Sequence, residues 1–291
     1  MSNDEFQDLV WQKGRELYRD MPWRNTDNPY LVMVSELMLQ QTQVDRVIPK
    51  YNEFILRYPD VYSLATAPLA DILGIWNGLG YNRRAKFLHD SAVKIVSDFD
   101  GKVPSTVESL MSLPGIGPNT AAAIAAYAFN QPVGFIETNI RTVYFQHFFA
   151  DSHLVTDDEL RRVVFETIPV FEKGKEQPDG RIDPDPGAMR KTVGLSHVRY
   201  WFWALMDYGA YLKKQGSGRI DKSAHYKKQS PLKGSAREVR GQIIRVLTKG
   251  TMTQAELIDE IIADDRYQPA LAALIKEGLV IQTGDKLHLT K

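Results

Sequence analysis

The chain of 291 residues is 43% hydrophobic and 25% charged, a composition typical of a globular protein with one large domain or two to three small ones. It has 36 basic and 36 acidic residues, so its net charge of zero does not by itself indicate a nucleic-acid partner. There is no cysteine, which excludes disulfides, thiolate zinc sites and cysteine-bound iron–sulfur clusters.

Two local features predict a cytoplasmic protein. The first ten residues, MSNDEFQDLV, are acidic, whereas a secretory signal peptide begins with a basic region. The longest small and apolar run, TAAAIAAYAF at 120–129, is too short to cross a bilayer.

Helical periodicity dominates the first 230 residues. In the first periodic run, Ser35 is a candidate N-cap for a helix whose apolar face carries Leu37, Met38 and Val44. That run also holds Glu36 among its apolar residues. Apolar residues recur every three or four positions through Val32–Ile48, Ala85–Val96, Arg141–Phe149 and Trp201–Leu212.

The segment VESLMSLPGIGPNTAAAIAAYAF at 107–129 predicts a helix–hairpin–helix. A helix that ends at Leu113 is followed by a tight turn, in which Gly115 and Gly117 allow a close backbone approach to a ligand. The first turn of the next helix, with Asn119 and Thr120, offers N–H groups that suit a phosphate. Such a motif grips DNA without reading its sequence. The alternative is a helix–helix corner that binds nothing.

Two segments that follow lack this periodicity. Residues 172–199 are interrupted by prolines and predict a long insertion. Residues 213–240 contain nine basic and two acidic residues, a local net charge of +7. Such a segment can follow a phosphate backbone, and the alternative is a solvated linker. Its candidate phosphate contacts are Lys222, Lys227 and Lys228.

The last 58 residues, 234–291, predict a winged helix. Helices are expected over Ala236–Leu247, over Thr253–Ile262 with Thr253 as its cap, and over Tyr267–Lys276 before Gly278. The sequence LVIQTGDKLHL then alternates around a turn, as a β-hairpin does. The third helix has only Lys276 near one end and Arg266 just before it, so a packing or partner role is as well supported as reading of the major groove.

Six motifs occur in order over residues 7–212: PWR, NPY, SELMLQQTQVDRVIPKY, GLGYNRRAKFLH, LPGIGPNTAAAI and ALMDYGA. This set resembles the adenine DNA glycosylases of the helix–hairpin–helix superfamily. The resemblance implies an enzyme that extrudes its target base from duplex DNA, because the glycosidic bond cannot be reached inside the stack. It also implies base excision repair as the setting.

The resemblance assigns roles to named residues. Glu36 matches the general acid that protonates adenine at N7, and apolar surroundings would raise its pKa. Gln41 matches the residue that intercalates beside the vacated position. Thr42, Leu79 and Tyr81 match positions around the opposite base, with Tyr81 as a wedge. The residues matching the lining of the adenine pocket are Trp23, Arg24 and Asp207.

Three departures from the family pattern, and one contrast with bifunctional relatives, qualify these roles. ETN at 137–139 stands where relatives have Asp-Gly-Asn, so Glu137 replaces an aspartate while Asn139 is retained. Asn119 occupies the position of the Schiff-base lysine of bifunctional relatives, which predicts a monofunctional glycosylase. The four cluster cysteines are absent. A winged helix replaces the usual Nudix-like domain, so the resemblance does not extend to recognition of 8-oxoguanine.

We therefore expect an all-α, two-lobed glycosylase core with a C-terminal winged helix that contains a small β-hairpin. One lobe comprises 1–29 and 135–228, the other is a helical barrel over 30–134 that carries the hairpin, and the winged helix covers 234–291. The expected catalytic residues are Glu36, Glu137 and Asn139.

The expected function is hydrolysis of the N-glycosidic bond of a mismatched base, adenine opposite 8-oxoguanine or guanine. The protein is expected to act as a monomer in the cytoplasm, associated with the nucleoid. No cofactor or metal is expected, apart from a monovalent cation that the hairpin turn could hold. The alternatives are a glycosylase for thymine or uracil and a non-catalytic protein that binds damaged DNA.

Overall fold

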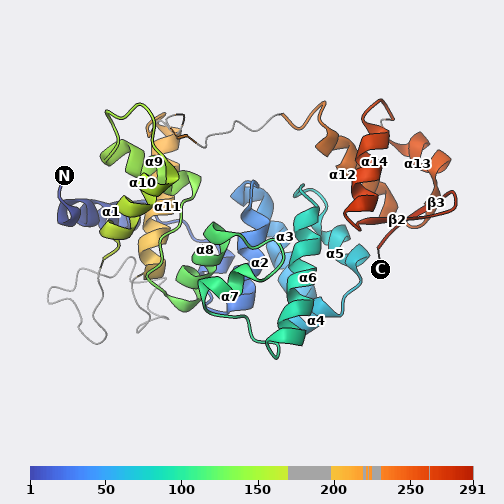
Figure 1. Cartoon of the computed structure of the whole chain (residues 1–291), viewed down its shortest axis with the longest axis horizontal. Coiled ribbons are helices and arrows are strands. Elements are labelled where there is room, and N and C mark those ends of the chain that lie inside the picture. The colour runs from blue at the N-terminus through green and yellow to red at the C-terminus, as the bar shows by residue number, and fades with distance from the viewer. Residues whose placement is uncertain (170–197, 219–220, 222, 225–230, 262, 291) are drawn as a thin grey trace. The chain divides into compact units, whose positions relative to one another are not determined.

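The chain is described from a computed structural model that covers residues 1–169, 198–218, 221, 223–224, 231–261 and 263–290. This part is mostly helical, and its short strands lie near the C-terminus (Figure 1). The predicted all-α class with a small β-hairpin is therefore confirmed. The predicted insertion at 172–199 lies outside the described residues except for its last two positions.

The chain forms two compact units. Unit 1 comprises Met1–Pro29, Ser105–Val107 and Gly117–Lys227, and unit 2 comprises Tyr30–Pro104, Glu108–Ile116 and Lys228–Lys291. The second helix of the hairpin thus belongs with unit 1, and the C-terminal elements belong with unit 2.

Unit 1 is built around its last helix, most of whose residues are buried. Phe6 near the N-terminus packs edge-on against Trp201 and Phe148, at centroid distances of 6.0 Å and 4.8 Å, so the N-terminus closes the same core as residues two hundred positions later. The helices of this unit are α1 (Asn3–Leu17), the short 3-10 helix η1 (Pro22–Arg24), α8 (Pro118–Phe129), α9 (Thr138–His147), α10 (Asp157–Thr167) and α11 (Val198–Lys214).

The helical part of unit 2 has its own apolar core, to which α2 contributes seven buried residues out of eleven. Phe54 and Trp76 meet edge-on at 6.3 Å in this core. The helices are α2 (Pro29–Leu39), α3 (Val44–Arg57), α4 (Val61–Ala65), α5 (Leu69–Trp76), α6 (Arg83–Asp98) and α7 (Val107–Met111).

The periodic run Val32–Ile48 is not one helix, and Ser35 is not its cap. Helix α2 begins at Pro29, which suits the first turn because its missing N–H needs no partner there. Ser35 is consequently interior and buried, and its hydroxyl donates to the Val32 carbonyl at 2.8 Å. Gln41 has a φ of 56°, which ends α2 and starts a turn before α3. Val44 therefore belongs to a different helix from Leu37 and Met38.

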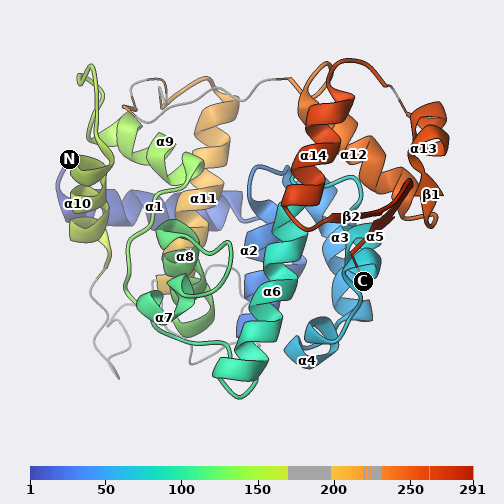
Figure 2. The ribbon, with the colours of Figure 1, turned by 45° about the vertical axis from the view of Figure 1, so that its right-hand side comes forward.

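The C-terminal elements form the predicted winged helix (Figure 2). Helices α12 (Ala236–Leu247) and α14 (Tyr267–Lys276) have the predicted bounds, and the Thr253 side chain caps α13 (Gln254–Glu260) by accepting from the Glu256 N–H. Strands β2 (Val280–Thr283) and β3 (Lys286–Leu289) form the predicted hairpin, with Gly284 at a φ of 63° in its turn. A further strand that the sequence did not predict, β1 (Met252–Thr253), pairs antiparallel with β3.

Candidate active site

Glu36 lies in a helix that is otherwise almost entirely buried. Its side chain is half-buried, and its neighbours Ser35 and Leu37 are each 1% exposed. A carboxylate in such a place is unusual, because burial of an ionisable group costs free energy unless the group is compensated. The placement among apolar residues is the one that the sequence predicted.

Glu137 occupies a different kind of position, at the N-cap of α9. Its side chain is exposed at the surface, yet the protein around it desolvates the carboxylate and raises the pKa above its ordinary value. The backbone N–H of Thr138 opposes this rise in pKa, as a donor at a helix N-terminus does. Asn139 lies in the first turn of the same helix and is half-buried.

The segment that carries Glu137 and Asn139 is held from two sides. The Oδ1 atom of Asn119 accepts a hydrogen bond from the Ile136 N–H at 3.2 Å. On α11, a Cβ atom added to Gly209 would lie 2.1 Å from the Asn139 carbonyl oxygen, so only glycine allows this approach of the two helices. Gly209 is a positioning residue that sequence reasoning missed, although it lies in the quoted ALMDYGA motif.

Asp207 and Arg24 form a buried ion pair. Arg24 donates to both carboxylate oxygens, at 2.7 Å and 3.0 Å. Arg24 is 6% exposed and Asp207 is 2% exposed. Arg19 Nε donates to the same carboxylate at 2.6 Å. The Arg24 guanidinium also lies 5.2 Å from the Trp203 ring. This pair fixes the short helix η1, in which Trp23 is buried with 7% of its surface exposed.

Gln41, Thr42, Leu79 and Tyr81 lie in two adjacent loops of unit 2. The Thr42 hydroxyl donates to the Leu79 carbonyl at 3.2 Å, which joins the loops. Gln41 is exposed at the turn after α2, whereas Leu79 is buried. Tyr81 is half-buried with a φ of 49°, and its hydroxyl accepts a hydrogen bond from Arg237 of α12. These two loops of unit 2 therefore hold Gln41 together with the three residues that the resemblance places around the opposite base.

The hairpin turn packs on α6. Gly115 has a φ of 74°, and a Cβ atom there would lie 2.4 Å from the Phe87 ring, so both its conformation and its surroundings require glycine. The Ser91 hydroxyl holds the turn by donating to the Pro114 carbonyl at 3.0 Å. Gly117 is the N-cap of α8 and supplies no side-chain cap, which leaves the N-terminus open toward an anion. Asn119 and Thr120 lie in the first turn of this helix.

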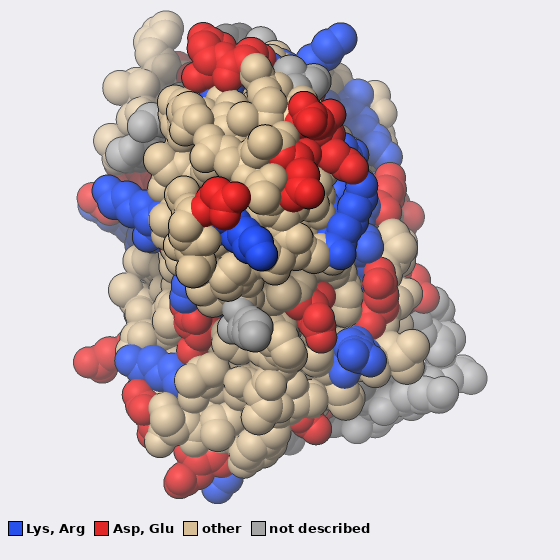
Figure 3. Space-filling view, turned by 90° about the vertical axis from the view of Figure 1, so that its right-hand side faces the viewer, with Lys and Arg blue, Asp and Glu red and all other residues tan. Residues whose placement is uncertain are grey.

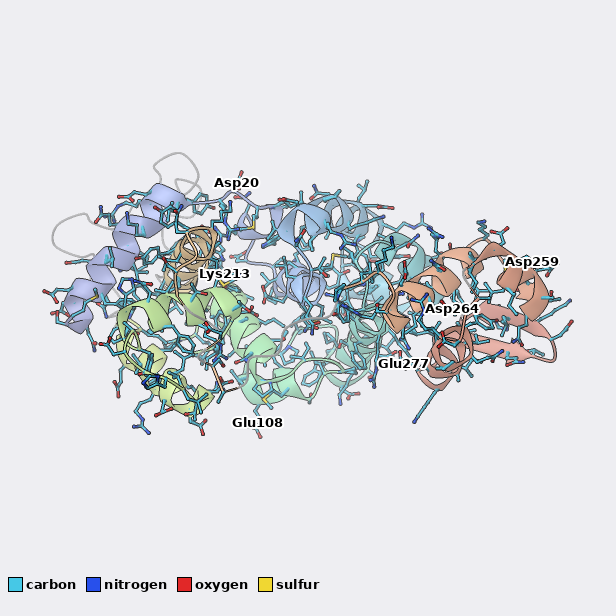
Figure 4. All side chains as sticks on the ribbon, turned by 90° about the horizontal axis from the view of Figure 1, so that it is seen from above. Asp20, Glu108, Lys213, Asp259, Asp264 and Glu277 are labelled. Carbon is cyan, nitrogen blue, oxygen red and sulfur yellow. The ribbon has the colours of Figure 1, made fainter. Side chains whose placement is uncertain are left out.

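The basic segment is only partly described. Lys222, Lys227 and Lys228 lie outside the described residues. Lys213 is exposed at the C-terminal end of α11 (Figure 4). Further along, the Ala224 N–H donates to the Val155 carbonyl at 3.0 Å, so the segment is attached to unit 1 at this point.

Arginines of the winged helix are engaged with carboxylates. Arg240 pairs with Glu277 at 2.6 Å, and Arg266 pairs with Glu238 at 3.3 Å and with Asp264 (both Asp264 and Glu277 are labelled in Figure 4). On the face that carries the C-terminal elements, basic and acidic side chains are interspersed (Figure 3). These contacts support the packing role of Arg266 over a role in reading the major groove.

Two general properties concern metals and membranes. Among the described residues, no group of three or more His, Asp or Glu side chains is arranged to hold a metal ion. Within the same ranges, every helix is too short or too polar to cross a lipid bilayer.

Comparisons with known proteins identify the family to which the chain belongs. A family model described as "HhH-GPD superfamily base excision DNA repair protein" matches residues 34–168. The adenine DNA glycosylase of Mycolicibacterium smegmatis is 35% identical over 92% of this chain and 89% of that protein. The adenine DNA glycosylase of Mycobacterium tuberculosis is 31% identical over 95% of this chain and 90% of that protein.

Solved structures show the same fold at lower identity. A thermostable thymine-DNA glycosylase has a TM-score of 0.58 and 22% identity, covering 72% of this chain and 86% of its own. Endonuclease III in a non-covalent complex with DNA has a TM-score of 0.52 and 16% identity. The match covers 79% of this chain and 90% of that chain.

Proposed function

Because the chain belongs to the adenine DNA glycosylase family within the helix–hairpin–helix superfamily, we propose that it extrudes adenine from a mispair and hydrolyses its N-glycosidic bond. The two mycobacterial relatives that carry this name match 92% and 95% of the chain and not the hairpin alone. The observation that supports the chemistry most directly is Glu36, an ionisable group in the otherwise buried helix α2.

Glu36 acts in this proposal as the general acid. Departure of adenine leaves negative charge on the base, and protonation at N7 removes that charge as the bond breaks. A carboxylic acid is a group of the type that performs this step.

Glu137 then stabilises the positive charge that develops on the sugar. An ionised carboxylate near an oxocarbenium-like centre lowers the free energy of the transition state. The raised pKa of Glu137 in the free protein means that its charged form is poorly solvated. A positive charge that develops beside it is therefore stabilised more than it would be beside a well-solvated carboxylate. Asn139, in the first turn of α9, orients the attacking water or the carboxylate in this proposal.

The chemistry ends at an abasic site in this proposal. Asn119 has no amine to form a Schiff base, and its side-chain oxygen already accepts the Ile136 N–H. The hairpin and the basic segment bind phosphates, while Gln41 and Tyr81 enter the stack. The bases opposite adenine are guanine or 8-oxoguanine, and the protein acts as a monomer.

A panel of duplexes tests this function. Each duplex places adenine, thymine or uracil opposite guanine, or adenine opposite 8-oxoguanine, and alkali then cleaves the strand at abasic sites. We expect cleavage of the adenine duplexes and no covalent adduct on borohydride trapping. Excision of thymine or uracil instead of adenine would show that the substrate is one of those bases. Binding without excision of any base would show that the protein is a non-catalytic DNA-binding protein.

A further inference from the structure

Arg84, the second residue of α6, is buried beneath the two loops that carry Gln41 and Tyr81. It is 7% exposed. Its side chain donates hydrogen bonds to backbone carbonyls and to the Thr42 hydroxyl. Neither the composition nor the resemblance gave this arginine a role.

One branch of the guanidinium holds the end of α2 and the turn that follows. Arg84 Nη1 donates to the carbonyls of Leu37 at 2.8 Å, Met38 at 2.9 Å and Gln40. The last carbonyls of a helix lack intrahelical donors, and a cation at that end also interacts favourably with the helix dipole. Arg84 therefore fixes α2 immediately after Glu36 and fixes the residue before Gln41.

The other branch holds the second loop. Arg84 Nη2 donates to the Thr42 hydroxyl at 2.9 Å and to the Gly80 carbonyl at 3.0 Å, and Nε donates to the Tyr81 carbonyl at 3.4 Å. The guanidinium carbon also lies 5.5 Å from the ring centroid of Tyr81. One side chain thus joins both loops to each other and to α6.

Both loops contain backbone that is costly to form. Gln41 and Tyr81 have φ angles of 56° and 49°, in the left-handed region that non-glycine residues rarely occupy. Such residues persist only where the surrounding structure holds them, and they occur preferentially at functional sites. Arg84 donates to the carbonyl of Gln40, the residue before Gln41, and to the carbonyl of Tyr81 itself. Burial lowers the pKa of Arg84 to about 10, so the group remains charged at neutral pH.

We propose that Arg84 is a positioning residue that holds Gln41 and Tyr81 in the conformation that enters DNA, and so determines how efficiently adenine is extruded. This inference rests on the proposed function, because it takes the roles of those two residues from it. The Arg84 side chain contacts the loops that carry Gln41 and Tyr81. Its effect falls on opening of the base pair and not on breaking of the glycosidic bond.

A conservative exchange separates this role from a general contribution to the fold. Arg84→Lys keeps the positive charge but replaces a planar fork of five donors with a single ammonium group, which cannot reach both loops together. Arg83→Lys is the matched control, since Arg83 is the adjacent residue, is exposed, and lies over the Phe87 ring.

The experiment compares single-turnover excision of adenine from two duplexes. In one duplex adenine lies opposite guanine, and in the other it lies opposite an abasic analogue, where extrusion costs least. We expect Arg84→Lys to lower the rate about tenfold on the first duplex and less than about threefold on the second, because displaced loops impair opening alone. Arg83→Lys should change the rate on either duplex by less than Arg84→Lys does.

The ratio of the two rates decides the outcome. Partial misfolding lowers both rates by the same factor and leaves their ratio unchanged, so the ratio reports opening even in a destabilised variant. Equal losses on both duplexes, or no loss on either, would overturn the proposal. If the unsubstituted protein releases adenine from neither duplex, the proposed function fails. The rate of 2-aminopurine extrusion, followed by fluorescence, then tests Arg84 without bond cleavage, and an unchanged rate in Arg84→Lys overturns the inference.

Discussion

Glu36 of unit 2 and Glu137 of unit 1 are placed by different physical means. Glu36 belongs to α2, and its half-buried position follows from the apolar residues on either side of it in the same helix. Glu137 stands at the start of α9, and its position depends on contacts made by Asn119 on α8 and Gly209 on α11. The first position is set by local sequence and the second by distant residues.

The difference shows where each carboxylate is vulnerable. A change of Glu36 itself removes the proton donor, while the helix around it retains its apolar packing. Glu137 can lose its function without being changed, since a displacement of about 1 Å in the segment 136–139 is enough to cost on the order of a hundredfold in rate.

The largest effect is expected for Glu36→Gln. The amide preserves shape but cannot donate a proton at the required pKa, so the single-turnover rate of adenine excision should fall about a thousandfold. Affinity for the mismatched duplex should stay within about threefold, since an amide of the same shape replaces one half-buried acid.

Glu53→Gln provides the control for this variant, because Glu53 is an exposed helical carboxylate paired with Lys50 at 3.1 Å. Exposed pairs contribute little to stability, so its excision rate should not change. Retention of most activity by Glu36→Gln would remove Glu36 from the role of general acid.

The next effect tests the distant support of Glu137. In Gly209→Ala the new methyl group cannot fit against the Asn139 carbonyl, so α9 and α11 must separate. We expect about a hundredfold loss in single-turnover rate together with a lower melting temperature. Gly74→Ala in α5 is the control, because a Cβ there meets nothing within 4 Å.

Gly209→Ala with full activity at temperatures below its melting transition would show that the position of Asn139 does not limit the reaction. Loss of activity in the Gly74→Ala control would show that glycine substitutions act nonspecifically.

The same contrast between local and distant determinants explains what the sequence could predict. The winged helix was predicted almost to the residue, because Thr253, Gly278 and Gly284 are local signals for a cap, a helix end and a turn. The break at 40–43 was missed. Its apolar spacing continues across the turn, and the residue that holds the turn, Arg84, is more than forty positions away.

The site followed the same rule. The resemblance identified Glu36, Gln41 and Tyr81 because each lies within a contiguous motif. It gave no role to Gly209 or Arg84, whose importance depends on what they touch in the folded chain. No periodicity or composition indicates such a contact.

A smaller effect is expected from the titration of Glu137. Because desolvation raises its pKa, the ionised form that the mechanism requires should be lost at a higher pH than for an ordinary glutamate. The rate of excision should therefore fall as the pH drops through this raised pKa. Glu137→Asp should lower the rate about tenfold at neutral pH, since the shorter arm is attached to a backbone that Asn119 and Gly209 hold in place.

Stability gives an independent measure of the same group. A carboxyl whose pKa is raised on folding stabilises the fold below its unfolded pKa, and that contribution is lost as the pH rises through the folded pKa. Glu137→Gln should consequently melt at a higher temperature than the unsubstituted protein at neutral pH, with a gap that narrows as the pH falls. An equal or lower melting temperature at neutral pH would indicate that Glu137 is well solvated.

The smallest effect on the excision rate is expected from replacing lysines in the basic segment, residues 213–240. These lysines are proposed to bind phosphates and not to act on Glu36 or Glu137. Phosphate contacts position a protein on DNA without reading bases, so loss of these lysines should weaken binding to matched and mismatched duplexes alike. The slope of log affinity against log salt should fall by about 0.9 for each lost contact, while the single-turnover rate at saturating protein should not change. The variant for this test has Lys222, Lys227, Lys228 and Lys233 all changed to alanine.

The control removes the same charge from other lysines, by replacing with alanine Lys94, Lys102, Lys249 and Lys276. An unchanged salt slope in the first variant, or an equal decrease in both, would show that the basic segment only tethers the winged helix. A selective loss of affinity for one mismatch would instead place the segment in base recognition. In that case, discrimination would no longer belong to the loops of Gln41 and Tyr81 alone, and the separation of phosphate binding from base reading would fail for this protein.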